Sequence, residues 1–171
     1  MNPTLKTIFA RRSIRSYTDQ PVDEQTVRDL LEAAMAAPSA VKTDPWLFHV
    51  VRREELKSAI ADYLPNGQML RRAPVGIVVV GDLDRAHSGE LSYLLQDCSA
   101  AIENLLLAAS MLGLGACWLG VHPRPDRIAG LRKLFDLSDS QVPVSAIALG
   151  WPEETHEPRT RYRDEAVTVH D

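Results

Sequence analysis

The stretch Glu90–Leu112, ELSYLLQDCSAAIENLLLAASML, is the longest segment of the chain that keeps one periodicity. Its apolar residues recur at helical spacing for about six turns, which predicts one long helix. Gly113 follows directly and predicts the helix end, because glycine readily takes the left-handed conformation found there. An apolar face this long in a chain of 171 residues indicates either a central core helix or a subunit interface.

Shorter helix and strand patterns alternate on both sides of this segment. Helices are predicted after the capping residue Asn2, from Asp23, over residues 54–64 and near residues 126–135. Runs rich in apolar and β-branched residues predict strands over residues 47–51, 75–80, 116–121 and 144–149. Residues 166–169 return to a strand-like pattern that needs a sheet to join. Without an internal repeat or linker, we expect one domain over residues 1–171.

The composition is that of an ordinary globular protein, with 45% hydrophobic and 25% charged residues. The longest apolar runs are far shorter than the roughly 20 residues that cross a bilayer, and no secretory signal follows the N-terminal arginines. Cys98 and Cys117 lack the spacing of a zinc site or a redox motif. We therefore expect a cytoplasmic protein without a membrane span or a metal site.

Several common enzyme signatures are missing from the sequence. The chain contains no GxxxxGK[ST] loop, no GxSxG elbow and no HExxH helix. Gly113-Leu114-Gly115 is not a dinucleotide-binding turn, because Trp118 takes the third glycine position and the segment leads from a helix into a strand. The histidines are scattered singly, so we expect surface or packing residues and not metal ligands.

A basic cluster, Arg11-Arg12-Ser13-Ile14-Arg15, follows the first predicted helix. Guanidinium groups match phosphate oxygens with planar pairs of donors, and the serine hydroxyl adds another, so a phosphate monoester would fit here. A solvated loop and a nucleic-acid contact are the alternatives. The net charge of −4 and the absence of a recognition-helix motif disfavour nucleic acid.

A second unusual segment, Ala37–Trp46 (APSAVKTDPW), joins a predicted helix to a predicted strand. Its small residues and two prolines make a stiff loop that can approach a flat ring closely. The alternative is a plain connection in which Trp46 only covers the core.

Together these segments resemble the nitroreductase family, whose Arg-Arg-Ser-x-Arg and Ala-Pro-Ser-Ala-x-x-x-x-Pro-Trp motifs stand here at residues 11–15 and 37–46. The resemblance continues through residues 73–74, 96–101, 113–120 and 148–152, and so covers nearly the whole chain. It implies an α+β fold of three α/β/α layers, with helices on both faces of a central mixed, mainly antiparallel sheet. It also implies an intertwined homodimer whose FMN sites lie at the subunit interface.

The resemblance assigns one group of residues to the phosphate end of FMN. Arg11 and Ser13 would hold the phosphate, and Arg12 would hold the phosphate or the ribityl chain. Arg161 would return to the phosphate from the polar tail, with Arg159 as the competing candidate.

A second group is assigned to the isoalloxazine ring. Arg15 would reach the N1/O2 edge, where a cation stabilises the negative charge of the reduced ring. The backbone at Leu119 and Gly120 would lie near N5. The ring contacts from the other subunit would be Pro38, Ser39 and Ala40.

Two positions depart from the family pattern, because Lys42 stands where asparagine is common and Asp44 stands where glutamine is common. Lys42 would lie near the flavin and add positive charge at its pyrimidine edge, or it would pair with Asp44 and be silent. These departures leave acceptor preference and redox potential open. Residues 66–70 and 82–89 are expected to shape access to the ring.

The activity implied by the resemblance is that of an NAD(P)H oxidoreductase. NADH or NADPH would deliver a hydride to flavin N5, and a small electron-poor acceptor such as a nitroaromatic, a quinone or an activated alkene would then take it. No catalytic side chain is expected, because the flavin carries the chemistry. The alternatives are a flavin-binding or sensing module without turnover, and a family variant that performs oxidation or reductive dehalogenation.

Overall fold

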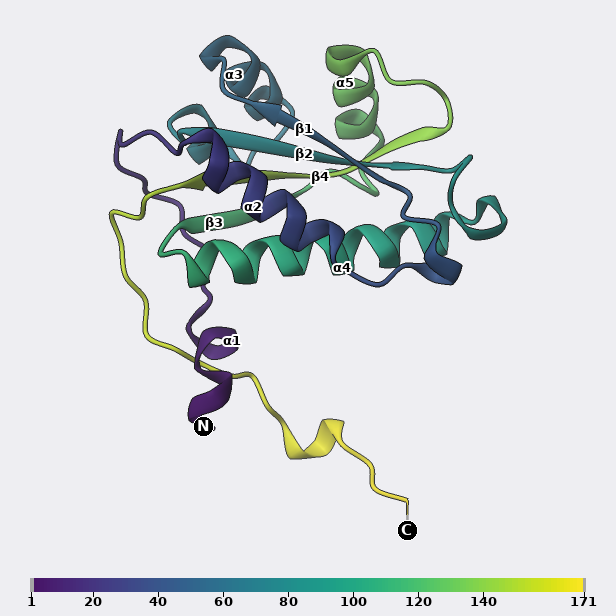
Figure 1. Ribbon diagram of the computed structural model, residues 1–171. Coiled ribbons are helices and arrows are strands. Elements are labelled where there is room, and N and C mark those ends of the chain that lie inside the picture. The colour runs from purple at the N-terminus through teal and green to yellow at the C-terminus, as the bar shows by residue number, and fades with distance from the viewer. Residues whose placement is uncertain (1, 171) are drawn as a thin grey trace.

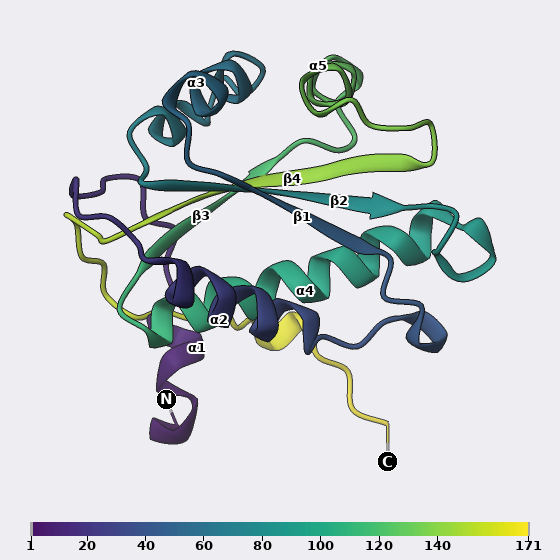
Figure 2. The same cartoon turned by 45° about the horizontal axis from the view of Figure 1, so that its top comes forward.

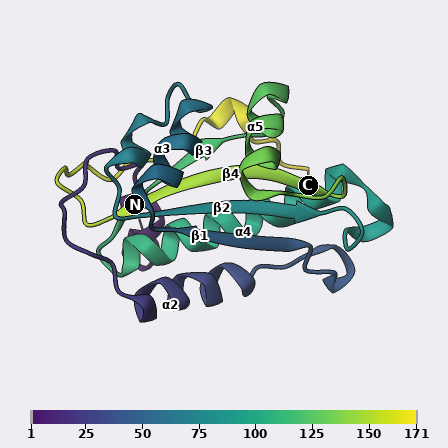
Figure 3. The ribbon, with the colours of Figure 1, turned by 90° about the horizontal axis from the view of Figure 1, so that it is seen from above.

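A computed structural model describes residues 2–170 as three layers, with one sheet between two groups of helices (Figure 1, Figure 2). The strands are β1 (Trp46–Val51), β2 (Val75–Asp82), β3 (Gly115–Gly120) and β4 (Gln141–Gly150), in the order β1-β2-β4-β3. Figure 3 shows β1 at one edge of the sheet and β3 at the other. Every strand pair in the described residues is antiparallel, and an isolated parallel bridge joins Ser13 to Ala116. The predicted α+β fold with a mixed, mainly antiparallel sheet is confirmed.

Helices cover both faces of the sheet. α2 (Glu24–Met35) and α4 (Leu91–Met111) pack together on one face, while α3 (Glu54–Asp62) and α5 (Pro125–Phe135) cover the other (Figure 2). α1 (Lys6–Ala10) packs against α4 and lies to one side of the layers (Figure 1). Short 3-10 turns complete the chain: η1 (Pro3–Leu5), η2 (Ala40–Lys42), η3 (Gln68–Arg71), η4 (His87–Gly89) and η5 (Asp164–Ala166).

The sheet separates two hydrophobic cores, and β2 contributes to both. Successive side chains of a strand point to opposite faces. Val75, Ile77 and Val79 accordingly lie in the core under α2 and α4, whereas Val78 and Val80 lie in the core under α3 and α5. This double burial explains why residues 75–80 form an uninterrupted apolar run.

The long helix predicted over residues 90–112 is confirmed as α4, and it is a core helix. One side of α4 is buried against the sheet and α2, including Leu94, Ile102 and Leu105. Gly113 ends the helix as predicted, with a φ of 79° that a side chain would disfavour. The Leu114 N–H then donates to the Ala109 carbonyl over 2.8 Å and closes the last turn.

The other predicted helices and strands are present with shifts of a few residues at their ends, apart from the last strand. No strand covers residues 166–169 in the described chain; Asp164–Ala166 form a turn, and the residues after it are exposed. The tail runs past α1, away from the sheet, so it has no strand to pair with (Figure 1, Figure 2). None of the helices within residues 2–170 has the length and apolarity needed to cross a membrane.

Candidate functional site

The N-terminal segment and the tail lie side by side and build the first part of the site. The Arg159 N–H donates to the Phe9 carbonyl over 3.1 Å. The Glu154 carboxylate accepts from the N–H groups of Arg15 (2.5 Å) and Ser16 (3.3 Å). These bonds, chiefly the one from Arg15, lower the pKa of Glu154. A charged Glu154 therefore fastens the tail to the basic cluster at neutral pH.

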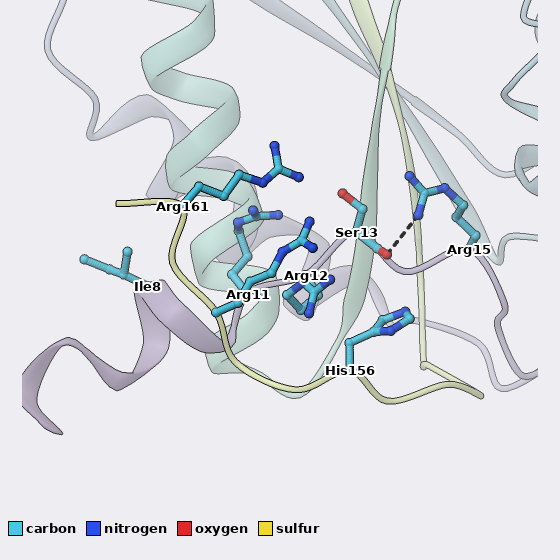
Figure 4. A pocket seen from close by; sticks show the side chains of 8 residues that line it. Ile8, Arg11, Arg12, Ser13, Arg15, His156 and Arg161 are labelled. Carbon is cyan, nitrogen blue, oxygen red and sulfur yellow. Dashed lines mark hydrogen bonds between the residues drawn. The ribbon is translucent and has the colours of Figure 1, made fainter. Parts of the chain in front are cut away.

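This arrangement encloses a cavity of about 480 Å³ between α1, the basic cluster and the tail (Figure 4). We call it the basic cavity; its lining residues are Ile8, Arg11, Arg12, Ser13, Arg15, His156, Arg159 and Arg161. None of these residues is a carboxylate. The charge of Arg12, and then that of Arg161, lowers the pKa of Arg159. Such crowding of like charges favours a bound anion.

Contacts within the chain hold several of these side chains in place. Arg11 Nε lies 3.4 Å from a Glu103 carboxylate oxygen on α4. Arg12 Nη1 donates to the Glu157 carbonyl over 2.5 Å. Arg15 Nη1 donates to the Ser13 carbonyl over 3.3 Å, as the dashed line in Figure 4 shows. The guanidinium groups are thus partly fixed before any ligand binds.

The structure brings together every residue predicted for the phosphate end. Arg161 reaches the basic cavity from the tail, and the competing candidate Arg159 lines the same cavity. His156 also lines the cavity, with its Nε2 at 3.4 Å from a Glu154 carboxylate oxygen. The sequence predicts only a surface or packing role for His156, because a lone histidine in a polar tail does not indicate a site until the path of the tail is known.

A second cavity of about 600 Å³ shares Arg15 with the basic cavity. We call it the strand-end cavity, because it opens at the end of β3. Its other lining residues come from the loop before η3, from β3 and from α5, and they are Leu64, Asn66, Gly67, Cys117, Trp118, Leu119, Gly120 and Arg127. The predicted pair Leu119 and Gly120 therefore does lie beside Arg15.

Gly120 leaves open space in the strand-end cavity. A Cβ built at Gly120 meets no atom within 4 Å, whereas a Cβ at Gly115 or Gly81 would lie 2.7 Å from Ile14 or 2.3 Å from Leu94. Packing within the chain therefore requires glycine at residues 115 and 81 but not at Gly120. A flat ligand that lies against the strand would explain the glycine at position 120.

The two cavities together fit FMN. The basic cavity offers guanidinium donors and a serine hydroxyl for a phosphate monoester. The strand-end cavity offers open space at Gly120, with Leu119 and Trp118 beside it, for a tricyclic ring. Arg15 stands where the two regions meet.

The sequence gives no specific role to six residues of the strand-end cavity, which are Leu64, Asn66, Gly67, Cys117, Trp118 and Arg127. Asn66 and Gly67 fall in the loop expected to shape access, whereas residues 82–89 line neither cavity. Cys117 is buried, and this burial raises the pKa of its thiol, so the group is protonated and is a poor nucleophile. Arg127 lies in the first turn of α5, and only the fold shows that this turn faces the end of β3.

The loop Ala37–Trp46 lies at the other half of α4. The Ala40 N–H donates over 3.0 Å to Asp97 Oδ1, and Asp97 is only 6% exposed. Val41, Lys42 and Asp44 all have positive φ, between 46° and 60°, which is unfavourable for residues with side chains. The buried Asp97 therefore fixes a strained loop to the helix.

The side chains of this loop bear on two of the alternatives raised by the sequence. Ser39 Oγ donates to Asp44 Oδ1 over 2.6 Å, and in the described residues Asp44 forms no ion pair with Lys42. Trp46 is 6% exposed and belongs to the core under α2 and α4, and this burial is compatible with a plain connection and with a loop that also contacts a ring.

The predicted site residues therefore form two groups in the single chain. Pro38, Ser39, Ala40 and Lys42 line neither cavity. Asp97, which anchors their loop, is about 13 Å along α4 from Leu106, which packs near the basic cluster. One chain does not bring the two groups together.

Comparisons with known proteins agree with this geometry. The model of the nitroreductase family matches residues 8–67 and 62–151. A protein of Methanothermobacter thermautotrophicus, assigned as an NADH dehydrogenase/NAD(P)H nitroreductase, is 45% identical over 92% of this chain and 80% of its own length.

Solved structures give the same result. A protein of Parabacteroides distasonis with the same assignment has a TM-score of 0.92 and 38% identity, and the match covers 100% of this chain and 99% of that one. A Desulfovibrio desulfuricans nitroreductase in complex with FMN has a TM-score of 0.84 and 33% identity over 100% of this chain and 98% of that one. The chain belongs to the nitroreductase family.

Proposed function

We propose that this protein is an FMN-dependent NAD(P)H oxidoreductase that reduces small electron-poor acceptors such as nitroaromatics, quinones and activated alkenes. The observation that carries the proposal is the pair of cavities that share Arg15, one suited to an anion and the other to a flat ring. The family relatives named NAD(P)H nitroreductase and FMN reductase, and the related structure solved with FMN, support the same activity.

In this proposal the basic cavity binds the phosphate of FMN. Arg11, Ser13 and Arg161 donate hydrogen bonds to phosphate oxygens, with Arg12 at the phosphate or the ribityl chain. Arg159 lines the same cavity and adds a further positive charge. The unfavourable proximity of these arginines is relieved when the phosphate is bound, which strengthens binding.

The strand-end cavity takes the ring, with Arg15 at its N1/O2 edge and the backbone at Leu119 and Gly120 near N5. When bound, FMN supplies the chemistry that passes a hydride equivalent from NADH or NADPH to the acceptor. Arg15 stabilises negative charge at the pyrimidine edge, and the absence of a side chain at Gly120 leaves room for the ring. The residues of the chain thus bind and orient FMN and stabilise charge on its ring, and none of them acts as a nucleophile.

A second copy of the chain completes the site. The loop that carries Pro38, Ser39 and Ala40 is anchored to α4 at Asp97, too far along the helix for these residues to reach the cavities of their own chain. We therefore assign them to the partner's flavin. The long helix, and the tail that wraps across the partner, would form the interface. Large apolar side chains left uncovered support this assembly, among them Met111 at 71% and Val169 at 76% exposure. In the dimer, residues 166–169 would gain the sheet neighbour that they lack in one chain.

A cytoplasmic location completes the proposal. Cys98 and Cys117 are free and buried, which fits a reducing compartment.

Steady-state assays test the activity. FMN-loaded protein should oxidise NADH or NADPH, and menadione or a nitrofuran should stimulate the oxidation. The Arg11→Ala variant should lose FMN during purification and lose this activity with it. If fully FMN-loaded wild-type protein is reduced by neither nicotinamide, the reductase proposal is wrong and a flavin-binding module without turnover takes its place.

A further inference from the structure

Arg127 lines the strand-end cavity but has no part in the proposed binding of FMN. It is the third residue of α5, which begins at Pro125, and its Nη1 donates to the Gly120 carbonyl over 2.7 Å. This bond ties the guanidinium to the strand end beside the proposed ring position. Arg127 is therefore held at the wall of the cavity and not free in solvent.

The charges around this cavity are all of one sign. Arg15 and Arg127 line it, and none of its lining residues within the described chain is a carboxylate. The ring edge accounts for Arg15. Arg127 forms no ion pair with any described residue, although Asp126 precedes it in the sequence. A cation at a cavity wall without a partner favours a ligand that carries negative charge.

The donor geometry narrows the ligand class. A guanidinium carries five N–H donors in a planar fork that matches the two oxygens of a carboxylate or a phosphate. The Gly120 carbonyl uses one nitrogen of Arg127, which leaves the others for a ligand. Asn66 lines the same cavity and its side-chain amide is a further donor, while Leu64 and Leu119 supply apolar walls. The cavity thus combines room for a ring with a group that binds anionic oxygens.

We propose that Arg127, assisted by Asn66, forms a subsite that binds an anionic oxygen group of the substrate. This inference rests on the proposed function, because it concerns the compound that exchanges electrons in the strand-end cavity. The anionic group would come either from an acceptor with a carboxylate on its ring or from the phosphates of the nicotinamide donor. Arg127 would then be a specificity residue, with preference for acidic over neutral substrates of equal size.

The test compares two acceptors of nearly equal size, one with a charged carboxylate and one with a neutral carboxamide. 4-Nitrobenzoate and 4-nitrobenzamide have the same ring and nitro group, so the ratio of their kcat/KM values isolates the acid group. The ratio is measured for FMN-loaded wild type, Arg127→Gln and Arg127→Lys. Arg124→Gln is the matched control, because it removes the same charge from the same end of α5 at a residue that lines neither cavity. The KM values for NADH and NADPH are measured in parallel.

If the acceptor supplies the anion, Arg127→Gln lowers the benzoate-to-benzamide ratio about tenfold, which corresponds to ~1.4 kcal/mol. Arg127→Lys restores much of the ratio and Arg124→Gln leaves it unchanged. If the donor supplies the anion, Arg127→Gln raises the KM for NADH and NADPH by a similar factor and leaves the benzoate-to-benzamide ratio of kcat/KM unchanged. If Arg127→Gln changes neither the benzoate-to-benzamide ratio nor the KM for the nicotinamides, the proposal is wrong. An equal loss for all acceptors with weaker FMN binding also overturns it, because Arg127 would then contact the flavin.

A binding measurement keeps this test separate from the proposed activity. Benzoate and benzamide are titrated into oxidised FMN-loaded protein, and the shift of the flavin absorbance gives each Kd. Tighter binding of benzoate that is lost in Arg127→Gln supports the subsite even if the protein reduces no acceptor. Equal Kd values for the two compounds in wild type rule out the acceptor as the source of the anion. Together with nicotinamide KM values that Arg127→Gln leaves unchanged, in a protein that does reduce 4-nitrobenzamide, they refute the subsite and leave the reductase intact.

Discussion

Replacement of Gly120 by alanine should weaken FMN binding without lowering the stability of the fold. The new methyl group would meet no atom of the chain within 4 Å, and Gly120 does not adopt a positive φ. Alanine in place of glycine within a strand stabilises the folded state by up to about 1 kcal/mol, because the unfolded chain loses less freedom on folding. We therefore expect an unchanged or slightly higher Tm for the apoprotein.

The same methyl group would occupy space that we assign to the flavin ring. An extra methyl group in a well-packed contact costs about 1–3 kcal/mol. Since ~1.4 kcal/mol is a tenfold change in Kd, FMN should bind about 5- to about 150-fold more weakly to Gly120→Ala. Quenching of FMN fluorescence on titration with apoprotein measures this change directly.

Gly115→Ala provides the opposite control on the same strand. A Cβ at Gly115 would lie 2.7 Å from two atoms of Ile14, a branched side chain held in the core. This variant should lose about 1–3 kcal/mol of unfolding free energy. In a protein of this size its Tm should fall by about 2–4 °C for each kcal/mol. If Gly120→Ala binds FMN as tightly as wild type, or if it unfolds like Gly115→Ala, the assignment of the ring to this cavity is wrong.

Three further predictions concern the anion site, the loop and the tail. Arg11→Ala should raise the Kd for FMN by about tenfold or more, because it removes charge-assisted hydrogen bonds. Its riboflavin affinity should stay unchanged, and an equal loss for both flavins in fluorescence titrations would contradict a phosphate site. Asp97→Ala should lower the unfolding free energy by about 1–3 kcal/mol in chemical denaturation, because the part-buried Ala40 N–H loses its acceptor. Asp97→Asn keeps an acceptor oxygen and should lose less, and equal losses would contradict a role for this hydrogen bond. The pKa of Glu154 is lowered from 4.5 by its backbone hydrogen bonds, so its contribution to stability is complete above about pH 4.5 and is lost as the pH falls through the lower folded value. The stability difference between wild type and Glu154→Gln should therefore vanish in acid, and a difference that persists below the folded pKa would contradict the role of charged Glu154 in holding the tail.

Much of the fold is predictable from local patterns. The helical spacing of residues 90–112 and the glycine at its end correctly predict α4, because an apolar face and a left-handed stop are local properties. The apolar run at residues 75–80 predicts a buried strand for the same reason. The strand predicted over residues 166–169 fails in the single chain, because pairing depends on a neighbour that the local sequence does not specify.

The site is predictable where its residues are close together in sequence. Arg11, Arg12, Ser13 and Arg15 lie within one short segment whose charge is visible without a structure. His156 lines the basic cavity only because the tail returns past the N-terminal segment. Arg127 lines the strand-end cavity only because α5 begins near the end of β3. Such contacts depend on tertiary structure, so they cannot be predicted from an isolated histidine or arginine in the sequence.

We propose that FMN binds where two copies of this chain meet. Size-exclusion chromatography with light scattering and flavin absorbance measures the mass and the cofactor content of the same species. We expect a yellow particle of twice the 19.0 kDa chain mass, with one FMN per chain. A particle of single-chain mass that retains FMN, or a colourless protein that takes up no added FMN, would contradict it.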